Sequence, residues 1–109
     1  MATLPKVMGV GYLPTGGTID LYTVPANTTG VVKAFWCING TGVSETVNIY
    51  IYTGAGSNYL LFASVLSSGD QVHFCEKDEV LPLNSSYVLR GTTTSTGCVS
   101  YYIAGVELT

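Results

Sequence analysis

The chain has 109 residues, of which 47% are apolar and 10% are charged, and its formal net charge is −3. This length corresponds to one domain with a single two-layer core, and so apolar a composition excludes a disordered chain. Because the apolar runs are far shorter than the roughly 20 residues of a membrane-spanning helix, and the four basic residues are scattered, we expect neither a membrane nor a nucleic-acid partner.

Residues 1–18 contain prolines and glycines in place of the continuous apolar segment of a secretory signal. We expect an extended N-terminal arm that is too rich in glycine and proline to fold alone. Its apolar side chains are interface candidates that would enter a neighbour's groove: Leu4, Val7, Met8, Val10, Tyr12 and Leu13. A frayed terminus is the structural alternative.

From residue 19 onward, short apolar runs alternate with turn-forming clusters of Gly, Asn, Ser and Pro every eight to twelve residues or so. This pattern predicts one all-β domain over 19–109, an antiparallel β-sandwich of jelly-roll or immunoglobulin type with about eight short strands. The expected strands are 19–24, 30–39, 45–53, 59–66, 71–76, 79–82, 86–92 and 97–108. Pro82 marks its strand as an edge or a strand end, because proline cannot donate to a ladder.

Three strands show how the side chains divide between the two faces of a sheet. In 45–53, Val47, Ile49 and Ile51 share the face that we expect to be buried, so Tyr50 and Tyr52 point outward. The strands 30–39 and 97–108 are apolar on both faces. In the first, the two sets are Val32, Ala34, Trp36 and Ile38, and Val31, Phe35 and Cys37; in the second, they are Val99, Tyr101 and Ile103, and Tyr102, Ala104 and Val106.

One small core cannot hide both faces of two such strands, so apolar surface should remain for a partner. Tyrosine and tryptophan are enriched where proteins meet, and charged residues are depleted there. We therefore add Trp36, Tyr50, Tyr52 and Tyr102 to the interface candidates.

The sequence offers little that points to catalysis. His73 is the only histidine, and the three cysteines Cys37, Cys75 and Cys98 lie in apolar runs without the paired spacing of a zinc site. Buried thiols in such surroundings are inert and typical of a chain made in a reducing cytoplasm. The acidic segment 76–79 lacks the glycine of a calcium loop and reads as a solvated turn. We expect no enzyme activity, no metal and no cofactor.

The segments LYTVPANTTGVVKAFWCING, ETVNIYIY and VSYYIAGVEL together resemble small β-sandwich virion proteins of tailed bacteriophages. The resemblance covers about residues 19–108, and its motifs are shared among decoration, head-fibre, neck and tail modules. One departure is Asn27, where such chains often have glycine. Asparagine is compatible with this position because it tolerates the left-handed conformation.

The resemblance implies a structural protein of the virion, assembled in the cytoplasm of a bacterial host. It implies a symmetric homo-oligomer, most often a trimer, bound to a major capsid protein or another virion protein. Since the chain shows no coiled-coil heptads or long fibre, the expected role is capsid decoration or cement. A neck, tail or fibre component is the alternative within the virion.

A carbohydrate-binding β-sandwich is the alternative from another class. Trp36, Tyr50 or Tyr52 would stack on a sugar ring, and a binding groove would also need Asn, Asp or Gln side chains converging on the same place. Whether they converge is not readable from the sequence.

Overall fold

A computed structural model describes residues 3–13, 15, 18–54, 56, 58–75, 80–94 and 99–109. The described residues form nine strands and contain no helix, and so none that could cross a membrane. The strands are β1 (Thr3–Tyr12), β2 (Ile19–Thr23), β3 (Thr29–Asn39), β4 (Glu45–Tyr52), β5 (Asn58–Leu66), β6 (Gln71–Cys75), β7 (Leu81–Leu83), β8 (Val88–Thr93) and β9 (Val99–Leu108). All eight expected strands are present, with bounds within two residues of the prediction.

The chain is folded back on itself at the connection between β4 and β5. From there outward, β4 pairs with β5, β3 with β6 and β7, β2 with β8, and β1 with β9, always antiparallel. β6 lies along Phe35–Ile38 of β3 and β7 lies along Gly30–Val32, so the two short strands follow one another on the same edge. The result is a long double-stranded ribbon.

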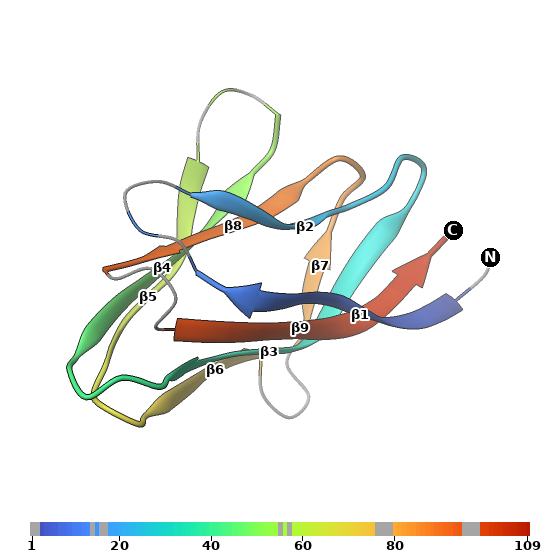
Figure 1. Ribbon diagram of the computed structural model, residues 1–109. Helices are drawn as coiled ribbons and strands as arrows, with labels where there is room; N and C mark the ends of the chain where they lie inside the picture. The colour runs from blue at the N-terminus through green and yellow to red at the C-terminus, as the bar shows by residue number, and fades with distance from the viewer. Residues whose placement is uncertain are drawn as a thin grey trace.

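Two further pairings, of β3 with β9 and of β4 with β8, roll this ribbon into two sheets. Sheet A has the order β1-β9-β3-β6, with β7 also paired to β3, and sheet B has the order β2-β8-β4-β5. Figure 1 shows the two layers, with β1 and β9 side by side in one and β2 and β8 in the other. This strand order is that of a jelly roll, so the predicted antiparallel β-sandwich is confirmed.

The core fills the space between the two sheets. Side chains from both layers are fully buried there, among them Phe35, Leu83 and Ile103 from sheet A and Ile49 and Leu89 from sheet B. Phe35 packs edge-on against Phe62 of β5 and Phe74 of β6, with ring centroids 6.4 and 5.1 Å apart. Phe62 and Phe74 stack at 4.5 Å, so this aromatic cluster joins the two layers.

The first strand departs from the expected arm. Residues 3–12 form β1, the edge strand of sheet A, whose register runs from Thr3 opposite Leu108 to Tyr12 opposite Ser100. Over residues 3–12, the segment expected as an arm therefore pairs within the sheet of the same chain. The sequence did not predict this strand because it contains glycine and proline, which are unfavourable in strand interiors.

Bulges also correct the expected division of β3 between its two faces. The ladder with β9 shifts register between Val32 and Ala34. Val32 is therefore buried with Phe35 and Cys37, while Val31 lies on the outer face with Ala34. One extra residue reverses the alternation, and the sequence pattern alone could not locate it. In β4 and β9, which have no bulge at these residues, the predicted faces are confirmed.

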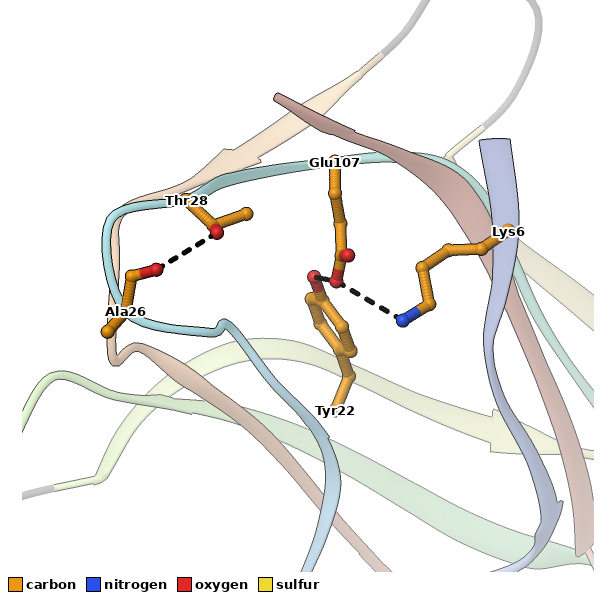
Figure 2. Close-up of polar contacts among 5 residues, drawn as sticks. All are labelled: Lys6, Tyr22, Ala26, Thr28 and Glu107. Carbon is orange, nitrogen blue, oxygen red and sulfur yellow. Dashed lines mark hydrogen bonds and ion pairs between the residues drawn. The ribbon is translucent and has the colours of Figure 1, made fainter. Parts of the chain in front are cut away.

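A buried carboxylate near the end of β9 connects three strands (Figure 2). Glu107 of β9 accepts a hydrogen bond of 2.6 Å from the hydroxyl of Tyr22, which belongs to β2 in the other sheet. Lys6 of β1 lies 3.4 Å from the same oxygen. Burial, and next the hydrogen bond to Glu107, raise the pKa of Tyr22 well above its usual value, so its hydroxyl stays protonated and donates.

The β2–β3 turn is locked to the β7–β8 turn. Asn27 has a φ of 57°, the left-handed conformation expected for this position. The Thr28 hydroxyl donates to the Ala26 carbonyl at 3.1 Å, as Figure 2 also shows. The backbone N–H of Thr28 donates to Ser85 Oγ, and that hydroxyl donates back to the Thr28 carbonyl at 2.6 Å. The two turns therefore hold the ends of their strands together.

We predict that Gly105→Ala destabilises the domain by about 3 kcal/mol, the upper range for overpacking a core. A Cβ at residue 105 would collide with the backbone carbonyl of Val31 on the neighbouring strand. Gly42→Ala is the matched control, because a Cβ there meets no atom within 4 Å. Urea unfolding of both variants measures the difference, and equal stabilities would contradict the predicted close approach of β3 and β9.

Candidate protein-binding interface

The outer face of sheet A carries an apolar surface that crosses the whole sheet. We call this surface the A face. Its exposed and half-exposed side chains come from all five strands: Pro5, Val7, Val10 and Tyr12 of β1; Ser100, Tyr102, Ala104 and Val106 of β9; Val31, Ala34, Trp36 and Ile38 of β3; Gln71 and His73 of β6; and Pro82 of β7.

An aromatic row forms the centre of the A face. The register places Val10, Tyr102, Trp36 and His73 opposite one another on four adjacent strands. Trp36 stacks on Tyr102 with ring centroids 4.6 Å apart and planes 17° apart, and on its other side lies 5.6 Å from the His73 ring. The rings support one another in a fixed arrangement, and such rigid aromatic surface is what protein interfaces use as anchors.

The residues expected in the N-terminal arm fall into two groups. Val7, Val10 and Tyr12 are 52%, 68% and 63% exposed and lie on the A face. Met8 and Leu13 are instead buried in the core of the domain itself, so a partner cannot reach them. The backbone of Leu4 pairs with Glu107 in the β1–β9 ladder, but its side chain is outside the described part of the chain.

The outer face of sheet B is different in character. Arg90 of β8 donates to Asp20 of β2 at 2.8 Å and to Asn58 of β5 at 3.1 Å. Its guanidinium also lies over the ring of Tyr52 of β4, 4.1 Å from the centroid. One side chain thus links all four strands of the sheet and uses their polar groups within the domain.

Tyr50 and Tyr52 consequently lie on the opposite side of the sandwich from Trp36 and Tyr102. The structure brings together Val10, Trp36 and Tyr102 among the sequence candidates, and it separates the two tyrosines of β4 from them. The sequence could identify outward side chains, but only the pairing of β3 with β9 shows which strands share a sheet.

The sequence missed two features near the A face. Val31 was grouped with Phe35 and Cys37, but the bulge places it on the outer face. Glu107, which holds β1 against β2 and β9 through Lys6 and Tyr22, was not singled out. A glutamate within an apolar closing strand was the available signal, since an unpaired buried charge is costly.

His73 and Cys75, two residues apart in β6, lie on opposite faces of sheet A. The ladder shifts register where Phe35 faces Cys75 and Trp36 faces His73, so Cys75 turns into the core while His73 stays on the outer face. The predicted burial of Cys37 and Cys75 is confirmed; Cys98 and residues 76–79 lie outside the described residues. Within the described part of the chain, no three His, Cys, Asp or Glu side chains group as they would around a metal ion.

We predict that Tyr102→Ala costs the isolated domain about 1 kcal/mol, the loss of one exposed ring stack, whereas Tyr101→Ala costs about 3–5 kcal/mol. The two tyrosines are neighbours in β9, but Tyr101 is 8% exposed and faces the core. Urea unfolding of each variant gives the two values. An equal loss of stability in both variants would contradict this prediction, because it would mean that the domain needs the Tyr102 ring as much as the buried Tyr101 ring.

We predict that Cys37 resists alkylation by iodoacetamide at pH 8 in the folded protein. Burial disfavours the thiolate and raises the pKa of Cys37 to about 12. Mass spectrometry of the peptide containing Cys37 should show modification only after unfolding in urea. Labelling of the native protein as fast as of the unfolded chain would contradict the assignment of this thiol to the core.

Comparison with known proteins finds likenesses of structure alone. No protein-family model and no curated protein matches the chain. Among solved structures, it is similar to chains from a T13 viral particle of infectious bursal disease virus (IBDV), from its VP2 subviral particle and from its Gt strain, with TM-scores of 0.38, 0.33 and 0.32. Each likeness has 14% identity and covers 97% of this chain but only 30%, 32% and 31% of the other chain.

Proposed function

We propose that this protein is a non-enzymatic structural subunit of a bacteriophage virion, a capsid decoration or cement protein that binds other virion proteins through the A face. The observation that carries the proposal is the apolar outer face centred on Val10, Tyr102 and Trp36. The jelly-roll topology supports it, because this fold is common in viral capsid domains. The sequence resemblance to small phage virion proteins supports it independently.

The A face has the properties that a protein partner requires. Three of its side chains on β1 are more than half exposed, and apolar residues of the neighbouring strands β9 and β3 continue the face. A stable interface buries about 800 Å² on each partner, with aromatic anchors at the centre and about 25 cal/mol for each Å² of apolar area removed from water. Burial against a neighbouring subunit would hold adjacent capsid proteins together.

We propose a trimer as the assembled form, with the major capsid protein as the further partner. Both details follow from the family resemblance. A closed symmetric oligomer would place three A faces around one axis or against one capsid surface, and heterologous contacts that close into a ring are the usual route to such a trimer.

The contacts of Arg90 on the outer face of sheet B argue against a sugar-binding site there. Tyr52 and Asn58 do converge there, as a carbohydrate site would require, but Arg90 covers the tyrosine ring and binds the asparagine and Asp20. The Tyr52 ring and the Asn58 side chain, which would stack on and bind a sugar, are therefore already in contact with Arg90.

We predict that the purified protein co-sediments saturably with virus particles from which it has been removed, and that Val10→Ser/Tyr102→Ser weakens this binding at least tenfold. The double substitution removes two neighbouring members of the central row, and central aromatic residues dominate interface energies. Light scattering of the free protein should give a mass that is a multiple of three chains.

Tyr50→Ser is the matched control, because it removes an outward tyrosine from the opposite sheet. It should bind particles as the unsubstituted protein does. Two results would refute the proposal: absence of the protein from intact particles in immunogold micrographs, or a monomer that is retained on a polysaccharide column.

A further inference from the structure

The two sheets have four edges, and three of them carry the features that protect a strand edge from pairing with another chain. β1 contains a proline, a lysine and a bulge between Val7 and Gly9. β2 has only five residues and includes Asp20. The edge formed by β6 and β7 is interrupted, and its second strand contains Pro82.

The fourth edge, β5, lacks most of this protection. Its nine residues, NYLLFASVL, include no charged residue, no proline and no glycine. β5 pairs with β4 on one side, and no described strand lies on the other. Tyr59, Leu60 and Val65 are 54%, 58% and 68% exposed. A long, apolar edge of this kind presents unpaired backbone N–H and C=O groups that another extended strand would satisfy.

We propose that β5 is a second contact surface, at which the β5 strand of another copy of this chain pairs antiparallel to extend sheet B across a two-fold axis. This inference does not depend on the virion role, because it concerns the edge of sheet B and leaves the A face free. An uncharged strand is the part of a chain of net charge −3 where two copies approach without opposing like charges.

The segment Phe62–Leu66 determines the register. The β4–β5 ladder shifts between Ile49 and Tyr50, which leaves Leu61 as the extra residue, and the alternation is regular from Phe62 onward. With Ser64 on the two-fold axis, Phe62 faces Leu66 of the second copy and Ala63 faces Val65. All the opposed side chains then point to the same side of the sheet, and the exposed Val65 meets a small neighbour.

The test uses two charge variants of the full chain, Ala63→Lys/Val65→Lys and Ala63→Glu/Val65→Glu. Both residues are exposed, so the substitutions leave the core intact. In the proposed register, each variant opposes like charges twice when it pairs with itself, and the two variants together oppose unlike charges twice. Sedimentation equilibrium should show that either variant alone has half the mass of the unsubstituted protein, with a dissociation constant at least tenfold higher, and that a mixture restores the larger mass.

Ile19→Lys is the control, since Ile19 is 42% exposed in β2, at the opposite edge of sheet B from β5. It should keep the mass of the unsubstituted protein. Unchanged masses for both charge variants, the result expected if β5 pairs with a strand of a different protein, would overturn the proposal. A mixture that fails to reassociate would overturn it as well. The Val10→Ser/Tyr102→Ser variant should still show the halving when combined with the lysine pair, so failure of the A face and failure of the β5 contact are separable.

Discussion

The antiparallel pairing of β3 with β9 is the contact on which the rest of the sandwich depends. It joins a strand near the start of the folded ribbon to its last strand, and through these two strands it holds β1, β6 and β7 in the same sheet. Gly105 lets the two backbones approach at the bulge in β3, and Glu107 at the end of β9 fastens this sheet to Tyr22 of the other layer. Without this pairing, only the pairing of β4 with β8 would hold the ribbon closed around the core.

The same pairing explains why the two outer faces differ. Because β3 and β9 are both central strands of sheet A, their inner faces fill the core while their apolar outer faces are added together, and Trp36 comes to lie on Tyr102. In sheet B, the equivalent central strands β8 and β4 bring Arg90 next to Tyr52. On this outer face, the polar groups around Arg90 bind one another within the domain, whereas sheet A leaves the apolar A face exposed.

Much of this architecture could be predicted from the sequence, because period-2 alternation and turn residues act locally. The eight expected strands, the outward Tyr50 and Tyr52 and the left-handed Asn27 all follow from such local signals. The missing information was non-local. β1 was not predicted because it contains glycine and proline and its partner β9 lies far away in the sequence. Val31 was grouped with Phe35 and Cys37 because the bulge, which reverses the alternation before it, could not be located. The sequence therefore predicted which strands carry apolar residues on both faces. The residues that form the A face could be identified only from the register of the strand pairs.

The two proposed contact surfaces lie on different layers, and together they would allow an assembly that neither surface alone would give. The A face covers the outside of sheet A, and β5 lies at the edge of sheet B, so both can be occupied at once. A subunit with one contact forms a closed pair or ring, whereas a subunit with two independent contacts can connect several neighbours into an extended layer. Three of the four sheet edges carry features that prevent pairing with another chain, and β5 lacks most of them. An unprotected apolar edge promotes aggregation. We therefore infer that pairing at β5 is functional. The order of contacts would follow from their chemistry: apolar faces associate without strict alignment, and strand pairing then fixes the register.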